Sequence, residues 1–112
     1  MKNQFLLTYS VKSGNTKNSD TDAENVRSNI VRFLRDNQDF DAIEKCPDVE
    51  TTITGKVLVS GMNETHKRTN IMKSICQVFE TLKIDQKIGD KSVHIYCVIL
   101  VQGLNLPIEF KV

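Results

Sequence analysis

Residues 92–102, SVHIYCVILVQ, constrain the fold of this chain more than any other stretch. Valine, isoleucine, tyrosine and cysteine dominate the run, and over this length they favour a β-strand rather than a helix. Side chains along a strand alternate between two faces. One face is wholly apolar and must lie against a core: Val93, Ile95, Cys97, Ile99 and Val101. The other face is polar at its ends and apolar between them: His94, Tyr96, Val98, Leu100 and Gln102. A strand with one face in water alternates more cleanly, so both faces of this strand should be covered.

The length and the charge of the chain bound what it can be. At 112 residues it should form one domain over residues 1–112, with a single core. Its 15 basic and 14 acidic residues leave a net charge of +1. Proteins that bind nucleic acid regardless of sequence usually carry a large basic excess. The composition therefore argues against such a protein, although it leaves room for a local basic patch.

Neither a membrane segment nor a secretion signal is expected. No apolar run approaches the roughly 20 residues that span a bilayer, and the N-terminal segment MKNQFLLTYS has too short an apolar stretch for a signal peptide. The three cysteines are an odd number, far apart and without a CxxC pair. Such cysteines are typical of reduced thiols in a cytoplasmic protein, not of a disulfide framework or a zinc site.

The first third of the chain reads as strand, loop and helix. Alternation predicts a strand over residues 4–11, and the polar sequence KSGNTKNS predicts a mobile loop over 12–19. A helix should follow over 20–37, begun by a capping box of Thr21 and Glu24. Its buried stripe recurs at helical spacing: Ala23, Val26, Ile30, Phe33 and Leu34.

Two further strands and a second helix complete the pattern before residue 92. A short strand is expected over 40–46, and a longer β-branched strand over 49–60, in which Gly55 permits a bulge or the close approach of a helix. Asn63 should cap a helix over 64–82. Its stripe is again apolar at helical spacing: Ile71, Met72, Ile75, Val78, Phe79 and Leu82. After the strand at 92–102, Pro107 confines the tail over 106–112 to a sheet edge.

The order of these elements predicts an α+β fold. Strand, helix, strand, strand, helix, strand is the order of the ferredoxin-like β-α-β-β-α-β sandwich, an antiparallel sheet with both helices on one face. The tail is a possible fifth strand. The apolar faces of the strands would then point at the two helical stripes.

The helix-free face of such a sheet would be unusually apolar. It would present an apolar patch of about 400 Å², near the upper end for soluble monomers, to which these residues contribute: Leu6, Leu58, Tyr96, Val98 and Leu100. Either the C-terminal tail or a second copy of the chain could cover it, and a second copy is favoured because the tail is short and Pro107 weakens its pairing. Single-stranded RNA is a weaker alternative, since stacking needs several aromatic residues and Tyr96 stands alone.

The residues that could carry chemistry do not form a recognisable catalytic set. His66 and His94 have ordinary explanations, at a helix start and at a strand end. No phosphate-binding glycine loop is present, and no metal site or cofactor is expected. A possible phosphate-binding surface would use basic residues of both helices: Arg27, Arg35, Lys67, Arg68 and Lys73. The favoured alternative is a solvated charged face on each helix.

Two family resemblances bear on function. The element order, the size and the segment Leu6-Leu7-Thr8-Tyr9 resemble the CRISPR-associated integration subunit family. That family has an aspartate directly after the tyrosine, whereas this chain has Ser10, so the resemblance does not extend to metal-dependent nuclease chemistry. The arginines of the first helix, the stretch 36–43 and the Thr-rich segment 51–54 resemble the GhoS-type endoribonuclease antitoxins. This second resemblance implies a metal-independent RNA-binding or RNA-cleaving antitoxin whose arginines hold phosphate.

Two hypotheses follow. The first is a small homodimeric interaction or regulatory module without its own catalysis, of the kind found in phage or defence-related systems, with a protein partner. The second is the RNA-binding antitoxin. Balanced charge, a single aromatic residue on the open face and the lack of a catalytic set favour the first.

Overall fold

The computed structural model describes residues 1–49 and 51–112 and has an α+β fold, as predicted. Two helices accompany five strands, whose bounds are β1 Lys2–Ser13, α1 Ser19–Asp36, β2 Phe40–Lys45, β3 Thr52–Leu58, α2 Glu64–Asp85, β4 Val93–Val101 and β5 Ile108–Lys111. The predicted third strand was expected to begin at residue 49 and to include residue 50, which lies outside the described residues.

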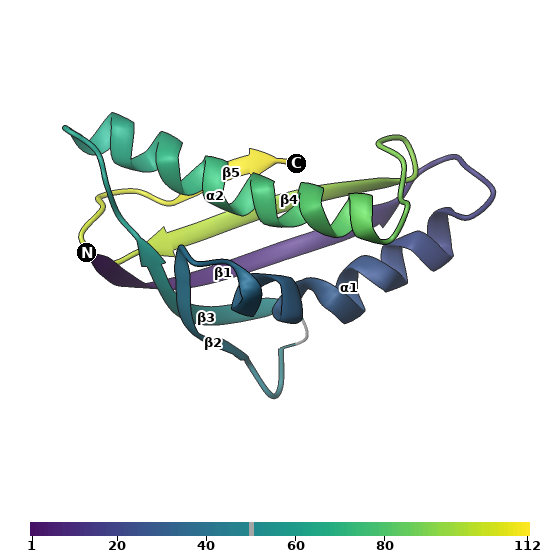
Figure 1. The fold of residues 1–112 in the computed structure, drawn as a ribbon, viewed down its shortest axis with the longest axis horizontal. Coiled ribbons are helices and arrows are strands. Elements are labelled where there is room, and N and C mark those ends of the chain that lie inside the picture. Colours follow the sequence, from purple (N-terminus) through teal and green to yellow (C-terminus); the bar gives the residue numbers. More distant parts are fainter. Residues whose placement is uncertain (50) are drawn as a thin grey trace.

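The strands form one antiparallel sheet in the order β2-β3-β1-β4-β5. β1 is the central strand and pairs with β4 without interruption from Phe5 opposite Val101 to Ser13 opposite Val93. Both helices cross the same face of this sheet (Figure 1), as predicted. β4 is therefore an inner strand, which explains why residues 93–101 are so rich in β-branched side chains.

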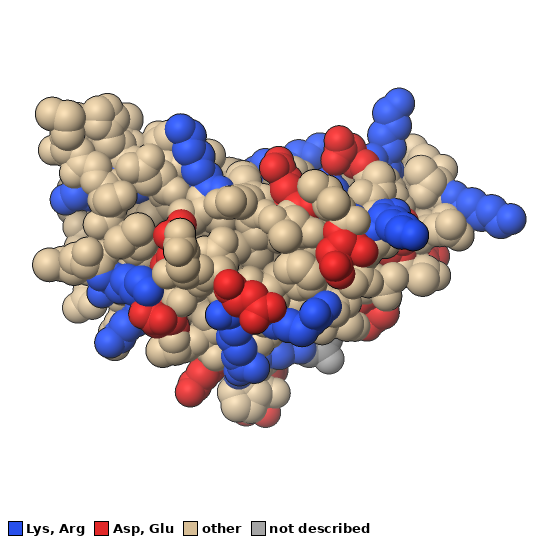
Figure 2. Space-filling view, in the orientation of Figure 1, with Lys and Arg blue, Asp and Glu red and all other residues tan. Residues whose placement is uncertain are grey.

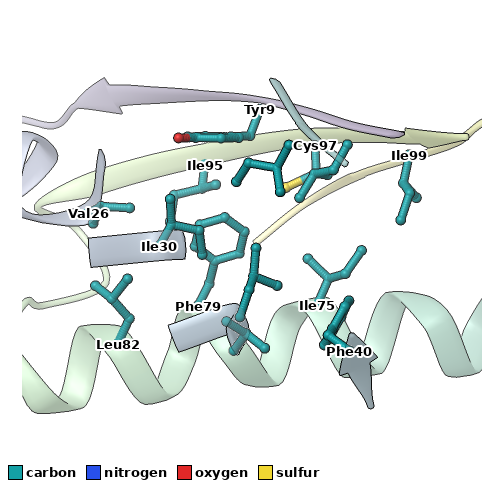
Figure 3. Close-up of a cluster of buried hydrophobic side chains, with 14 of the residues drawn as sticks. Tyr9, Val26, Ile30, Phe40, Ile75, Phe79, Leu82, Ile95, Cys97 and Ile99 are labelled. Atoms are coloured by element: carbon teal, nitrogen blue, oxygen red, sulfur yellow. The ribbon is translucent and has the colours of Figure 1, made fainter. Parts of the chain in front are cut away.

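The core fills the space between the sheet and the two helices. The apolar faces of β1 and β4 point at the stripes of α1 and α2, and Figure 3 shows Tyr9, Ile95 and Cys97 extending from the strands toward Phe79 of α2. The ring of Phe79 lies 6.3 Å from that of Tyr9. The predicted helical stripes are buried, except that Phe33 and Met72 are only partly so.

The start of α1 differs from the prediction. The helix begins at Ser19 with Asn18 as N-cap, and no side chain caps it, so the expected capping box of Thr21 and Glu24 does not form. The loop before it was expected to be mobile, yet it is tied to the start of β4. The Gly14 amide donates to the Ser92 carbonyl over 2.8 Å, and both loops lie at the same end of the molecule (Figure 1).

Gly55 was expected to permit a bulge in its own strand or the close approach of a helix, and it does neither. The irregularity is in the neighbouring strand, where the β2–β3 register shifts between Asp41 and Glu44, and Ala42 adopts a φ of 52°. A Cβ on Gly55 would lie 2.7 Å from Ile43 Cδ1 and 2.9 Å from the Asp41 carbonyl oxygen. The glycine therefore gives the bulged strand room to approach.

The second helix and the tail follow the sequence closely. Asn63 caps α2, its side chain accepting a hydrogen bond from the His66 amide over 2.9 Å. The tail forms β5, an edge strand that begins directly after Pro107. Neither helix in the described part of the chain combines the length and the apolarity that a transmembrane segment needs.

Candidate functional site

The helix-free face of the sheet carries a continuous apolar strip. Leu6 on β1 lies directly opposite Leu100 on β4, and the next outward pairs are Thr8 with Val98 and Ser10 with Tyr96. Exposed fractions are 37% for Leu6, 43% for Tyr96 and 49% for Leu100, while Val98 between them is half-buried. Four of the five apolar residues predicted for this face are therefore neighbours on two adjacent strands. We call the set Leu6, Tyr96, Val98 and Leu100 the apolar strip.

The C-terminal tail does not cover the strip. It pairs edgewise with β4, from Ile108 opposite Ile99 to Lys111 opposite Tyr96, and so extends the sheet sideways. The sequence left open two covers for this face, a folded-back tail and a second copy. Within the described chain, the tail is not folded over the face. The face has no cover from the tail.

Leu58, the fifth predicted residue, lies apart from the strip. It ends β3 and pairs with Lys2, whereas Thr54 is the residue of β3 opposite Leu6. Leu58 is half-buried. The face is polar next to Leu58, where its register partner Lys2 forms an ion pair with Asp41 over 2.8 Å.

Cationic groups gather at the other end of the strip. Lys12 Nζ lies 5.6 Å from the centroid of the Tyr96 ring, and Lys111 Nζ lies 5.7 Å from it. His94 is the register partner of Lys12. An ammonium group near an aromatic face is attracted by the ring quadrupole. The exposed ring of Tyr96 is therefore held in a positively charged setting that the sequence alone did not indicate.

The arginines predicted to bind phosphate are engaged with backbone carbonyls. Arg27 donates to the Val11 carbonyl at 2.6 Å, and Arg35 donates to the Ile43 carbonyl at 3.1 and 3.3 Å. Arg68 holds two carbonyls of the loop before β5, at 2.7 and 2.9 Å. Each guanidinium thus ties a helix to the sheet or to a loop beside it.

These basic residues are also not brought together. Arg35 contacts β2 at one edge of the sheet, and Arg68 contacts the segment leading into β5 at the other edge. Lys67 and Lys73 are half-buried and exposed, respectively, on α2. Figure 2 shows basic and acidic side chains interspersed on the face seen in Figure 1, where the helices cross in front of the strands. This distribution favours solvated charged faces over a single phosphate-binding surface.

The two histidines do not meet. His66 is exposed at the start of α2, and His94 lies at the far end of β4, beside a shallow pocket lined by Glu80, Lys83, Asp90, His94, Lys111 and Val112. The buried Lys83 amine is paired there with Asp90 at 3.0 Å. Within residues 1–49 and 51–112, no group of three or more His, Cys, Asp or Glu side chains could hold a metal ion.

A cluster of hydroxyl groups was missed by the sequence analysis. Thr16 Oγ1 lies 2.9 Å from Ser19 Oγ and 3.1 Å from Ser92 Oγ, and Ser92 donates a short hydrogen bond to Asp22. Ser19 and Ser92 are buried. Because the cluster joins the start of α1 to the start of β4 and both of its serines are buried, we assign it a structural role. We call it the hydroxyl cluster.

The cysteines are free thiols in different settings. Cys97 is buried on the core face of β4, and burial, with a smaller contribution from Cys76, raises its pKa to about 12. Burial and, secondarily, Glu80 also raise the pKa of Cys76. Because the thiolate is the reactive form, a raised pKa lowers reactivity.

Comparison of the chain with protein-family models, with curated proteins and with solved structures gives no match. The apolar strip and the cations at its end are therefore the features from which a function must be inferred.

Proposed function

We propose that the fold is ferredoxin-like, with β5 as an added edge strand. The elements from β1 to β4 follow the order of that class, and the neighbours β2-β3-β1-β4 are antiparallel with both helices on one face. β5 is the departure from the pattern. It widens the sheet next to the strand that carries Tyr96, Val98 and Leu100.

The function proposed for this fold is that of a non-catalytic interaction module, which forms a homodimer through the helix-free face. The apolar strip carries this proposal, because Leu6, Tyr96 and Leu100 stand exposed on the adjacent strands β1 and β4, and half-buried Val98 joins Tyr96 to Leu100. The largest apolar patch on the surface of a soluble protein is often a functional surface. A face that two copies share would cover it without any further partner.

The size of the strip suits a dimer of ordinary dimensions. Together with the alkyl stems of Lys12 and Lys111, it amounts to a few hundred Å². A standard interface buries about 800 Å² per partner, of which somewhat more than half is apolar. The strip thus matches the apolar centre of such an interface, and the polar residues around it match the rim.

The experiment is a mass measurement by light scattering on the wild-type chain and two variants, at micromolar concentration. Leu100→Asp places a charge within the strip, directly opposite Leu6, and should give a monomer that keeps its helical circular dichroism. The matched control is Ile84→Asp, which changes another exposed apolar residue, 79% exposed near the end of α2. That variant should remain a dimer. A wild-type mass of one chain refutes the proposal.

The alternative, RNA binding of the antitoxin type, is supported by one observation. The exposed Tyr96 ring with Lys12 and Lys111 close to it is a setting in which one base could stack while its phosphates meet ammonium groups. A fluorescent oligouridine titration at several salt concentrations tests it. Saturable binding that weakens with salt and is lost in Tyr96→Ala would favour RNA over the homodimer.

A further inference from the structure

Two hollows adjoin where the end of α2 meets the start of β4. Their volumes are about 320 and 260 Å³, and Glu80, Lys83 and Asp90 line both of them. β5 does not close this place, because its pairing with β4 ends with Lys111 opposite Tyr96, and the start of β4 extends beyond it (Figure 1). We call the two hollows together the α2–β4 groove. Among the described residues that line the groove, none belongs to the apolar strip.

Helical spacing brings charged and apolar side chains together in the groove. Glu80, Lys83 and Ile84 stand three and four positions apart, so they share one face of α2. The segment after the helix adds the buried side chain of Ile88 and the exposed carboxylate of Asp90. The groove therefore places an ammonium group, two carboxylates and an apolar surface close to one another.

The ammonium group of Lys83 is the buried polar feature of the groove. The Lys83 side chain is only 8% exposed, whereas Asp90, its ion-pair partner at 3.0 Å, is 98% exposed. A lysine ammonium has three donors, and a buried one needs acceptors for all of them. In the part of the chain that the structure describes, Asp90 is the only acceptor within hydrogen-bonding distance of Lys83 Nζ. The remaining donors are available to an acceptor that enters the groove.

The groove offers both signs of charge, which restricts the ligand that it can take. Lys83 and Lys111 supply ammonium groups, and Glu80 and Asp90 supply carboxylates. A simple anion would be attracted by the lysines and repelled by the acids, and a simple cation would meet the reverse. A small molecule that carries both charges side by side can pair with both sets. Ile88 then offers an apolar contact to its third substituent.

We propose that the α2–β4 groove binds a free α-amino acid with an aliphatic side chain. The carboxylate of the ligand accepts from Lys83 and Lys111, its ammonium group donates to Glu80 and Asp90, and its side chain lies against Ile88. A ligand this small should bind with a dissociation constant of about 1 mM. This site goes beyond the proposed homodimer and does not depend on it.

A titration followed by amide NMR spectra tests the proposal, with L-leucine as the probe. Amide signals of residues 80–94 should shift saturably. Isocaproate lacks the ammonium group of leucine and isoamylamine lacks its carboxylate, so each should bind about tenfold more weakly or worse. The absence of any shift at about 20 mM L-leucine overturns the proposal, and so does isocaproate or isoamylamine binding as tightly as leucine.

A substitution of Lys83 gives an independent test. Lys83→Met removes the ammonium group and keeps an unbranched side chain, so it should weaken L-leucine binding about tenfold or more. The fold should persist, because the carboxylate that loses its partner lies in water. The matched control is Lys73→Met, which changes an exposed lysine of the same helix and should leave binding unchanged. Wild-type affinity in Lys83→Met overturns the proposal.

The same variants separate this site from the homodimer. Lys83→Met should keep the mass of the wild-type chain in light scattering, and Leu100→Asp should still bind L-leucine. A single-chain mass of the wild type would therefore refute the homodimer and leave the groove standing. Loss of L-leucine binding in Leu100→Asp with an intact fold would overturn the independence of the groove from the helix-free face.

Discussion

Gly14→Ala should destabilise the chain out of proportion to the single methyl group that it adds. A Cβ at this position would lie 2.0 Å from the Lys91 carbonyl oxygen and 3.0 Å from that of Ser92. Both are backbone atoms, so the loop before α1 must move away from the start of β4. The movement breaks the 2.8 Å hydrogen bond from the Gly14 amide to the Ser92 carbonyl and pulls Thr16 away from the hydroxyl cluster.

The expected magnitude follows from these contacts. Two lost hydrogen bonds are worth about 1 kcal/mol each, and a buried Ser92 hydroxyl with fewer partners adds a similar amount. The free energy of unfolding should therefore fall by about 2–3 kcal/mol. For a chain of this size that corresponds to a drop in melting temperature of about 8–12 °C.

Urea unfolding followed by circular dichroism, at one fixed protein concentration, measures the effect. The matched control is Gly89→Ala, because a Cβ on Gly89 meets no atom within 4 Å. That variant should stay within about 0.5 kcal/mol of the wild type. If Gly14→Ala is as stable as Gly89→Ala, the loop is not held against the start of β4, and its assigned role is wrong.

Three other predictions concern the thiols and metal ions. A thiol reagent should modify Cys46 first and Cys97 last in the native protein, and equal rates would contradict the burial of Cys97 on β4. Because the folded-state pKa of Cys97 is about 12 and the ordinary value is 9.0, the unfolded chain loses this proton first as the pH rises. Stability from this thiol is therefore full below pH 9 and declines above it by up to about 1.4 kcal/mol per pH unit, which urea unfolding should show as a steeper alkaline loss in the wild type than in Cys97→Ala. Melting temperatures with Mg²⁺, Mn²⁺ or EDTA should agree within about 2 °C, and a saturable rise with one ion would reveal a site that we do not expect.

Alternation along the strands was sufficient to predict most of the sheet. β1 and β4 each place an unbroken apolar set on one face, so their orientation toward the helices follows from a period of two. The helical stripes of α1 and α2 pack against these faces. The same alternation predicted the helix-free face, since Leu6 and Leu100 lie at the alternate positions of their strands and point away from the helices.

The contacts that depend on docking distance could not be predicted. Arg27 and Arg35 are of a residue type that binds phosphate, so the sequence suggested that role. Their guanidinium groups instead donate to backbone carbonyls, which the position of α1 against the sheet brings within reach. The segment 14–19 is polar throughout, so nothing in it indicates that Ser19 would be buried. Thr16, which contacts Ser19, also pairs with Ser92, 76 residues away in sequence, and such pairings are set by the register of β1 and β4.

The bulge of β2 also hinders the addition of further strands at this edge of the sheet. An unpaired outer strand is a template on which further chains can add and grow into fibres. Ala42 in its left-handed conformation bends β2 at the point where a straight incoming strand would have to pair. At the opposite edge β5 offers only a short segment whose outward side chains, Glu109 and Lys111, are charged. Open-ended polymerisation is thus discouraged along both margins, and the homodimer proposed for the helix-free face needs neither of them.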